Sequence, residues 1–283
     1  MQILDGKTLS KKIKQKISND VQKLKQQNIT PGLAVIIVGD DEASHIYVNM
    51  KEKACKESGI YSIVHKMPID IDQEKIIETI NMMNNNQNID GILVQLPLPK
   101  HINTQKVLQS ISPQKDVDGF HPFNVGKLVL DLDTFAPCTP LGVIRLLDEY
   151  KIDLKGLNVC IVGASNIVGK PMMNLLLNRF ATVDICHIHT KDLKSHTKRA
   201  DLLIVGVGKA NLIDKDMVKD NAIVVDIGTN RLKSGKLVGD VKFDEVSKKC
   251  SFITPVPGGV GPMTIAMLLE NTLKAAQQRI NRC

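Results

Sequence analysis

The chain has 283 residues, a formal net charge of +7, 43% hydrophobic residues and only 3% aromatic residues. This length allows two domains or one large α/β domain, and the apolar content can bury a full core without metal or disulfide staples. The absence of Trp and the scarcity of other aromatic side chains argue against a base-stacking surface for nucleic acid. Because the lysines are scattered, the positive charge favours a polyanionic small molecule as partner.

The cysteines and the apolar runs indicate the cellular compartment of the protein. No Cys-x-x-Cys pair or zinc-type spacing occurs among the six cysteines, so we expect no metal site. The first residues lack the charged-then-apolar pattern of a secretory signal, and no apolar run approaches the length of a membrane-spanning helix. We therefore expect a soluble, cytoplasmic protein with free thiols and no membrane partner.

Hydrophobic periodicity predicts alternating helices and strands in the first half. An amphipathic helix is expected from Leu9 to Leu24, ending before Thr30-Pro31-Gly32. The further elements expected here are a strand over Leu33 to Val38, a helix ending at Gly59, a strand over Tyr61 to His65, a helix over Gln73 to Met83 and a strand over Gly91 to Leu96. This repeated order predicts a mainly parallel sheet covered by helices.

The helix after the first of these strands carries a candidate catalytic pair. Tyr47 and Lys51 are four residues apart, which places them on one helix face, and Ser44 lies one turn earlier. This helix begins at the carboxyl end of a strand, where open α/β sheets bind their ligands. A phenol beside an amine is suited to moving protons. Taken alone, the same spacing is more often that of a solvated surface pair.

The stretch from Ser112 to Pro140 loses periodicity and is expected to be a functional segment or a domain junction without regular structure. A second α/β series follows. Its expected elements are a helix over Leu141 to Tyr150, strands over Leu157 to Val162, Val183 to Ile188, Leu202 to Val205 and Ile223 to Asp226, and a last helix over Thr264 to Arg279.

The segment from Val159 to Pro171 reads as a strand, a tight turn and the start of a helix. It is a variant of the dinucleotide fingerprint, with Ser165 at the second glycine position and Gly169 one residue late. Small residues let the backbone approach a pyrophosphate, and the helix N-terminus supplies free N–H groups. A strand-to-helix turn without a ligand has the same pattern, so the motif alone leaves both interpretations open.

The next strand bears on the choice of nucleotide. NAD-binding folds of this kind place an acidic residue about 20 positions after the turn, on the ribose hydroxyls. Here Asp184 lies early in the strand, whose expected end reads His187-Ile188-His189. The missing acidic residue at the end removes repulsion against a 2′-phosphate and favours NADP. We expect the two histidines, as alternate strand residues without a third ligand, to be structural.

Several segments together resemble the bifunctional methylenetetrahydrofolate dehydrogenase/cyclohydrolase family. The matching segments occur in the family's order and span almost the whole chain: Ser44-x-x-Tyr47-Val48-x-x-Lys51, Asp90 to Pro99, Lys115 to Gly119 with Asn124-Val125-Gly126, Pro137 to Pro140, Gly163 to Pro171, and Pro255 to Thr264. The Gln-Leu-Pro-Leu-Pro and Pro-Gly-Gly-Val-Gly-Pro-Met-Thr segments are individually specific.

The resemblance implies an α/β fold of two domains with mainly parallel sheets, a Rossmann-like second domain and an active-site cleft between them. It implies oxidation of 5,10-methylenetetrahydrofolate with NADP and hydrolysis of the methenyl product to 10-formyltetrahydrofolate, within one-carbon metabolism and purine biosynthesis. The implied domains are residues 1–139 for folate and catalysis, residues 140–262 for NADP, and a helix over residues 263–283 that returns to the first domain.

By resemblance, Lys51 is the central catalytic group of hydrolysis, Gln95 orients it, Tyr47 stacks beside the folate and Asp118 accepts hydrogen bonds from the pterin. A protonated lysine repels a cationic intermediate, so we expect Lys51 to be at least partly neutral during hydrolysis. The other substrate-binding residues implied are Ser44, Val94, Leu96, Pro257, Gly258, Gly259, Val260 and Gly261. The cofactor-binding residues implied are Gly163, Ala164, Ser165, Ile188 and Thr229.

Two positions depart from the family pattern. Ile188 stands where relatives often carry Arg or Ser toward the 2′-phosphate, so NAD remains possible and Lys170, His189 or Lys191 would have to compensate. Thr229 replaces a residue that is commonly apolar. The resemblance also implies a homodimer through the nucleotide domain, and the net charge favours polyglutamylated folates.

Two other classes of protein are consistent with parts of the sequence. Short-chain dehydrogenases carry a Tyr-x-x-x-Lys pair, but they place the glycine turn before the pair, whereas here Tyr47 precedes Gly163 by more than a hundred residues. A nucleotide-binding regulatory protein without catalysis is expected to have lost a catalytic group. The set of Tyr47, Lys51, Gln95 and Asp118 is intact.

Overall fold

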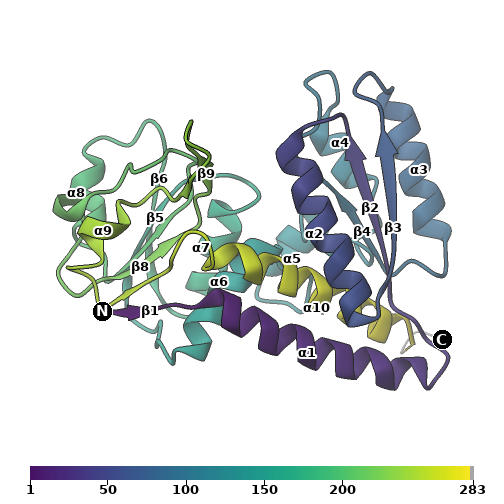
Figure 1. The fold of residues 1–283 in the computed structure, drawn as a ribbon, viewed down its shortest axis with the longest axis horizontal. Coiled ribbons are helices and arrows are strands. Elements are labelled where there is room, and N and C mark those ends of the chain that lie inside the picture. Colours follow the sequence, from purple (N-terminus) through teal and green to yellow (C-terminus); the bar gives the residue numbers. More distant parts are fainter. Residues whose placement is uncertain (281–283) are drawn as a thin grey trace. The chain divides into compact units, whose positions relative to one another are not determined.

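The structure is a computed structural model that describes residues 1–280. The chain forms two compact units (Figure 1). Unit 1 consists of residues 1–10 and 139–264, and unit 2 consists of residues 11–138 and the chain from Ile265 onward. The two long helices α1 (Gly6–Lys25) and α10 (Val260–Ile280) contribute residues to both units.

Unit 2 is built on a three-stranded parallel sheet in the order β3-β2-β4. Its strands are β2 (Gly32–Val38), β3 (Tyr61–Met67) and β4 (Gly91–Val94). All seven residues of β2 are buried, because this central strand is covered on both faces. The helix α2 (Glu42–Ser58) packs on β2 and β3, and α3 (Gln73–Asn85) packs on β4. The parallel sheet covered by helices is therefore confirmed.

Local signals set the ends of α2. Asp41 Oδ2 accepts a hydrogen bond of 2.8 Å from Ser44 N, which satisfies one of the free N–H groups of the first turn. Gly59 ends the helix in the left-handed region with φ of 76°, where glycine has no side chain to clash. The predicted end of this helix at Gly59 is confirmed.

Unit 1 contains a six-stranded parallel sheet in the order β1-β11-β8-β7-β5-β6. Its strands are β1 (Gln2–Ile3), β5 (Asn158–Val162), β6 (Thr182–Cys186), β7 (Leu202–Val205), β8 (Ile223–Asp226) and β11 (Phe252–Ile253). A short antiparallel pair, β9 (Asn230–Arg231) and β10 (Leu237–Val238), lies outside it. The helix α7 (Gly169–Leu177) packs on β5 and β6. This arrangement confirms the predicted Rossmann-like, mainly parallel second sheet.

The remaining helices are short or lie at the unit boundary. They are α4 (Thr104–Gln109), α5 (Pro122–Val129), α6 (Cys138–Glu149), α8 (Leu193–Thr197), a 3-10 turn η1 (Lys215–Met217) and α9 (Phe243–Val246). Each unit has its own apolar core. One cluster includes Val162, Val205 and Val224 in unit 1, and the other includes Ile36, Ile92 and Ile80 in unit 2.

Several expectations from the sequence were wrong in their details. The stretch from Ser112 to Pro140 is not structureless, because it contains α5 and the start of α6. α5 has eight residues and starts with Pro122, too short a span for helical periodicity to emerge. The strand β6 ends at Cys186, so His187 and His189 are turn residues and not alternate residues of a strand.

The helix α10 also begins earlier than its periodicity indicated, at Val260 instead of Thr264. Its first turn contains Gly261 and Pro262, which break the apolar pattern. Proline is tolerated there, because the first N–H groups of a helix have no partner within it.

In unit 2, the Asn271 side chain of α10 is buried and donates hydrogen bonds to Val117 O at 2.8 Å and Ala136 O at 3.1 Å.

Candidate active site and nucleotide site

The structure brings Lys51 of α2 and Gln95, the residue after β4, together in unit 2. Lys51 Nζ donates a hydrogen bond of 2.9 Å to Gln95 Oε1. Gln95 Nε2 donates to Leu96 O at 2.8 Å, and Gln95 N donates to Ile36 O at 2.8 Å. Lys51 is only 9% exposed, so its amine is held by an oriented acceptor in a largely desolvated position. A solvated surface pair is thereby excluded for Lys51.

Tyr47 and Ser44 lie one and two turns before Lys51 on the same helix. Ser44 is buried, and its backbone N–H is used in the helix cap by Asp41. Tyr47 is 38% exposed, so its ring retains a free surface. Val94 is buried in β4, and Leu96 is partly exposed at the start of the proline-rich turn. Four predicted substrate residues thus lie on α2 and at the end of β4, the two places in the chain that supply Lys51 and Gln95.

Asp118 lies in a loop that is closed by a second carboxylate. Asp116 is buried and accepts hydrogen bonds from Phe120 N at 3.2 Å and His121 N at 2.8 Å. The Asn124 side chain donates to Asp116 Oδ2 at 2.8 Å and to Pro113 O at 2.9 Å. Asp116 therefore bridges the loop on both sides of Asp118. In the sequence, Asp116 and Asn124 belong to a family motif, but no local pattern there indicates that Asp116 bridges the loop.

Burial raises the pKa of Asp118, and the negative charge of Asp116 adds to the rise. The positive charge of Lys51 and a hydrogen bond with Cys138 act in the opposite direction on that pKa. Burial likewise raises the pKa of the Cys138 thiol well above its ordinary value. Cys138 is consequently a protonated, buried donor that contacts Val117 O, and not a nucleophile.

In unit 1, the turn between β5 and α7 is formed by glycines whose neighbours leave no room for a side chain. Gly163 has φ of 124°, and a Cβ there would overlap Gly206 O. A Cβ on Gly169 would overlap Gly163 O. The turn is thus compact enough for its backbone to approach a phosphate, as the dinucleotide fingerprint requires.

Ser165 replaces the second glycine of the fingerprint and stabilises the turn itself. Its Oγ accepts hydrogen bonds from Val168 N at 3.1 Å and Gly169 N at 3.4 Å. Ala164 is partly exposed and Ser165 is exposed. Both residues precede the N-terminus of α7, where unpaired N–H groups and the helix dipole favour an anion. The cradle at Gly163 and Gly169 fits a dinucleotide.

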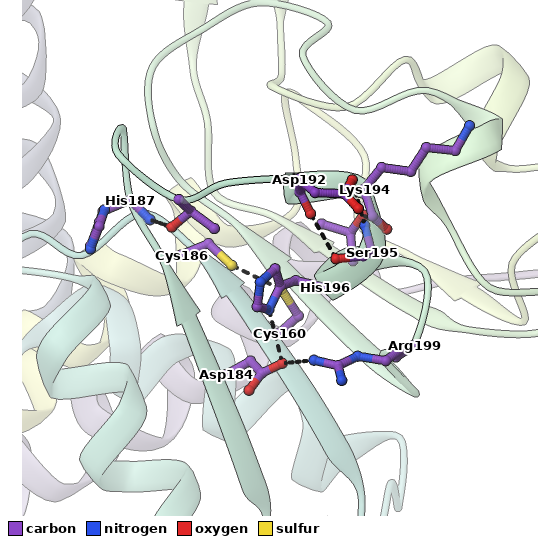
Figure 2. A network of polar contacts seen from close by, with 11 residues as sticks. Cys160, Asp184, Cys186, His187, Asp192, Lys194, Ser195, His196 and Arg199 are labelled. Atoms are coloured by element: carbon purple, nitrogen blue, oxygen red, sulfur yellow. Dashed lines mark hydrogen bonds and ion pairs between the residues drawn. The ribbon is translucent and has the colours of Figure 1, made fainter.

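Asp184 of β6 is engaged away from the end of its strand. Arg199 Nη2 donates to Asp184 Oδ2 at 2.6 Å, and the His196 ring lies 3.2 Å from the same oxygen (Figure 2). The last residue of the strand is Cys186, whose Sγ lies 3.8 Å from Cys160 Sγ on β5. No carboxylate therefore stands at the end of β6, in agreement with the interpretation from the sequence.

Ile188 and Thr229 follow β6 and β8 of the same sheet. Ile188 is 93% exposed, in a turn where His187 N donates to Thr190 Oγ1 at 2.8 Å. Thr229 is exposed in the loop between Gly228 and Asn230. Because the strands are parallel, these loops and the Gly163 turn all lie at the carboxyl end of the sheet.

The glycine-rich segment before α10 is held by backbone contacts in unit 1. Gly258 has φ of 110°, and its carbonyl accepts a hydrogen bond of 2.8 Å from Lys7 N. Gly259 is so close to Pro255 O and Thr254 that a Cβ would contact both within 2.8 Å. Pro257 follows a cis peptide bond, Val260 is buried, and Gly261 has open space beside it.

Two further features of residues 1–280 bear on the kind of protein. No group of three or more His, Cys, Asp or Glu side chains there is arranged to hold a metal ion. Across the same residues, every helix is too short or too polar to cross a bilayer. Five cysteines are free and buried, and Cys283 lies outside the described residues.

A Rossmann-like unit with a glycine turn, together with a unit that holds a buried lysine at the carboxyl end of a parallel strand, defines a nucleotide-dependent α/β enzyme. Comparison with known families gives the particular class. Residues 4–118 match the catalytic domain of tetrahydrofolate dehydrogenase/cyclohydrolase, and residues 137–280 match the NAD(P)-binding domain of the same family. The chain belongs to the tetrahydrofolate dehydrogenase/cyclohydrolase family.

Individual relatives agree with the family models over the whole chain. The "Bifunctional protein FolD" of Nitratiruptor sp. is 71% identical, with 99% of each chain covered. A crystal structure of the bifunctional enzyme FolD from Campylobacter jejuni is 58% identical, with 99% of each chain covered and a TM-score of 0.97. The enzyme of Trypanosoma brucei, complexed with NADP cofactor and inhibitor, is 34% identical with 98% of each chain covered and a TM-score of 0.95.

These findings confirm the fold and the function expected from the sequence. The chain is a bifunctional enzyme with methylenetetrahydrofolate dehydrogenase and methenyltetrahydrofolate cyclohydrolase activities and an NAD(P)-binding domain. The short-chain dehydrogenase and the non-catalytic regulatory protein are thereby excluded.

Proposed function

We propose that Lys51 is the proton carrier of the cyclohydrolase step and that Gln95 orients it. The hydrogen bond from Lys51 Nζ to Gln95 Oε1, in a position where the lysine is largely buried, supports this assignment most directly. As water adds to the cationic methenyl carbon, Lys51 Nζ accepts a proton. As the C–N bond then breaks, the same amine donates that proton to the leaving ring nitrogen, and the hydroxyl group of the adduct loses its proton to solvent as the formyl C=O forms, so that one proton is released overall. A positioned group of this kind contributes roughly 10²–10⁴ in rate.

The pterin end of the folate is assigned to Asp118. An ionised carboxylate accepts two hydrogen bonds from the amino and ring N–H groups of a pterin in a charge-assisted, bidentate way. The bridge that Asp116 makes across the loop keeps the Asp118 backbone in place before substrate binds. Tyr47 offers its exposed ring to the folate, and Ser44, Val94 and Leu96 line the same region of unit 2. Pro257 to Gly261 remain predicted folate contacts.

The dehydrogenase step is assigned to a nucleotide held by unit 1, with NADP as the preferred form. When bound, the oxidised nucleotide accepts the hydride that leaves the one-carbon bridge of the folate. Gly163, Ala164 and Ser165 bind the phosphates, because the turn is compact and faces the N-terminus of α7. Ile188 and Thr229 border the nucleotide at the carboxyl end of the sheet.

The preference for NADP over NAD is supported by charge. Asp184 is occupied by Arg199 and His196, so it does not repel a 2′-phosphate at the end of β6 (Figure 2). Ile188 offers no hydrogen bond to that phosphate. Lys170, His189 and Lys191 are the basic residues that we assign to the 2′-phosphate in its place, and Lys170 Nζ donates to Asn166 Oδ1 at 2.7 Å. The T. brucei relative complexed with NADP supports the same choice.

The remaining assignments concern partners and compartment. The enzyme acts on tetrahydrofolate derivatives in the cytoplasm as a homodimer that requires neither nucleic acid nor a membrane. The net charge of +7 favours polyglutamylated folates over monoglutamates. Michaelis constants for the two forms, measured at low and high salt, test the last point. A lower constant for polyglutamates that rises with salt supports it.

The whole assignment is tested by two spectroscopic assays on the purified enzyme. Formation of reduced nucleotide from methylenetetrahydrofolate, with NADP and with NAD separately, gives the dehydrogenase activity and the cofactor preference. Decay of methenyltetrahydrofolate absorbance without nucleotide gives the cyclohydrolase activity. We expect both activities and a higher kcat/KM with NADP. An enzyme that reduces NAD more efficiently than NADP would overturn the cofactor assignment and leave the cyclohydrolase assignment in place.

A further inference from the structure

Two buried carboxylates at the carboxyl end of the unit 1 sheet have no part in the site as predicted from the sequence. Asp226 is the last residue of β8 and is 3% exposed, and Asp240 follows β10 and is fully buried. Burying a carboxylate is costly unless hydrogen bonds compensate for the lost water. The partners of these two groups therefore show what they hold in place.

Asp240 joins two loops that follow neighbouring strands. Its Oδ2 accepts hydrogen bonds from Val207 N at 2.7 Å and Gly208 N at 3.0 Å, in the loop after β7. Its Oδ1 accepts a hydrogen bond of 2.8 Å from Asn230 Nδ2, in the segment after β8. Thr229, the residue predicted to lie near the nicotinamide, immediately precedes Asn230. One carboxylate thus fixes both loops relative to each other.

Asp226 in turn fixes Asp240. Its Oδ1 accepts hydrogen bonds from Gly228 N at 2.9 Å and Asp240 N at 3.0 Å, and its Oδ2 accepts one of 2.9 Å from Val241 N. A Cβ on Gly228 would overlap the Asp240 carboxylate, and a Cβ on Gly239 would overlap the Asp226 carboxylate. The two glycines therefore leave the space that the carboxylates occupy.

The loop after β7 also contacts the phosphate turn directly. Gly206 N donates to Val162 O at 2.9 Å, and a Cβ on Gly163 would overlap Gly206 O. Gly206 precedes Val207, whose N–H is held by Asp240. A shift of this loop would consequently alter the surface against which the Gly163 turn packs.

We propose that Asp240, held by Asp226, is a positioning residue for the nucleotide. Its carboxylate fixes the loops after β7 and β8, so that the Gly163 turn and Thr229 form a site before the nucleotide binds. A preformed site avoids the entropy cost of ordering loops on binding, and this raises affinity. The inference rests on the proposed role of unit 1 in binding NADP.

A reciprocal exchange of Asp240 and Asn230 tests the inference. In Asp240→Asn, the new amide faces the Asn230 amide, so two donors meet or the N–H groups of Val207 and Gly208 lose their acceptor. In Asn230→Asp, two carboxylates face each other. The double variant Asp240→Asn/Asn230→Asp restores one donor opposite one acceptor and keeps an oxygen for the loop after β7.

We expect each single variant to raise the dissociation constant for NADP, measured by calorimetry, by about tenfold or more, because a buried polar group is left without its partner. The double variant is expected to recover most of this loss, which is the signature of direct coupling in a double-mutant cycle. The matched control is Asp201→Asn. Asp201 lies at the amino end of β7, where it accepts from Asn158 N at 3.0 Å, and its substitution is expected to leave NADP affinity within about twofold of the parent.

The readouts separate positioning from a general loss of stability. The KM for NADP should rise in the single variants while the cyclohydrolase rate, measured without nucleotide, stays near that of the parent. If Asp240→Asn does not fold, Asn230→Asp carries the test, since Asn230 is only partly buried. Single variants that lower the melting temperature with no change in the NADP dissociation constant would overturn the inference. A parent enzyme that binds no NADP would instead refute the proposed function.

Discussion

Lys51 Nζ donates its hydrogen bond to Gln95 Oε1 over 2.9 Å, across 44 residues of sequence. The same amide donates from Nε2 to Leu96 O, so the orientation of the Gln95 side chain is set by both ends. A neutral acceptor holds the amine without forming an ion pair with it. This relationship joins a helix to the end of a strand, and it supplies the physical basis for assigning proton transfer to Lys51.

Replacing Lys51 by Met is expected to abolish the hydrolytic step and keep the fold. Methionine has nearly the same length and fills the buried position, but it has no proton to accept or donate. We expect the cyclohydrolase rate to fall by roughly 10²-fold or more. The measurement is the decay of methenyltetrahydrofolate absorbance, with circular dichroism and the dissociation constant for NADP as checks that both units are folded.

Lys53 provides the matched control for this variant. It lies on the same helix, but its side chain is 75% exposed and pairs loosely with Glu57 at 3.9 Å. The Lys53→Met enzyme should hydrolyse substrate at the rate of the parent. Hydrolysis by Lys51→Met at the parent rate would show that another group moves the proton.

Replacing Asp118 by Asn is expected to weaken folate binding through the loss of a charged acceptor. Hydrogen bonds to a charged group contribute about 1.5–3 kcal/mol, so the KM for methylenetetrahydrofolate should rise by about tenfold or more. Because burial raises the pKa of Asp118, the parent should also lose folate affinity on acidification at a higher pH than an ordinary aspartate would allow. The Asp118→Asn enzyme should lack this pH dependence.

Asp131→Asn is the control for Asp118→Asn. Asp131 is exposed and has φ of 55°, a left-handed conformation that Asn also adopts readily. Steady-state kinetics of the two variants from pH 5 to 8 make the comparison. An unchanged KM in the Asp118→Asn enzyme would remove the carboxylate from the pterin site.

The sequence predicted those elements whose signal is local. Leu33 to Val38 forms β2 because a continuous apolar run fits a central strand that is buried on both faces. The end of α2 at Gly59 and the glycine turn at Gly163 follow from conformations that favour glycine. The Lys51 and Gln95 pair was reached only through family resemblance, since no spacing rule relates residues on a helix and a distant strand end.

The features that were missed depend on contacts between distant residues. Asp116 is buried because Asn124 and two loop N–H groups meet it, and Asp240 is buried because the loops after β7 and β8 converge on it. In the sequence alone, each looks like a polar residue beside a strand or turn. The predicted end of β6 at Ile188 was wrong for a different local reason. Ile188 is apolar and so resembles a strand residue, but it is 93% exposed in the turn after Cys186.

Replacing Ile188 by Arg is expected to increase the preference for NADP over NAD. The side chain is 93% exposed, so the substitution should cost little stability. A guanidinium matches the geometry of a phosphate with two parallel hydrogen bonds, and the 2′-phosphate distinguishes the two nucleotides. We expect the ratio of kcat/KM for NADP to that for NAD to rise by about tenfold.

Ile188→Gln separates charge from contact in the same position. It has polar atoms and comparable reach but no charge, and the ratio should change by less than the Arg variant changes it. Equal ratios for the parent and Ile188→Arg would show that this residue lies away from the 2′-phosphate. The cyclohydrolase rate without nucleotide should be the same in all three enzymes.

Asp226 is expected to titrate at a higher pH than an ordinary aspartate, and its titration should make the free energy of unfolding depend on pH. Burial raises the pKa of this carboxyl from its ordinary 3.8 to about 6, and the neighbouring charge of Asp240 adds to the rise, while the N–H groups of Val241, Asp240 and Gly228 oppose it. Between these two values the native state holds a proton that the unfolded state has released. Protonation of Asp226 therefore stabilises the native state at low pH, and this stabilisation is lost as the pH rises through about 6.

The difference between the folded pKa of about 6 and the ordinary pKa of 3.8 corresponds to about 3 kcal/mol. Ionised Asp226 lowers the free energy of unfolding by this amount at neutral pH. Asp201 provides the internal contrast, because hydrogen bonds from Lys219 and Asn158 lower its pKa. Carbon-13 NMR of the side-chain carboxyls should show Asp226 titrating near pH 6 and Asp201 below its ordinary value. An Asp226 signal that titrates near 4 would mean that the three N–H donors, and not burial, determine its charge, and the expected loss of stability would be absent.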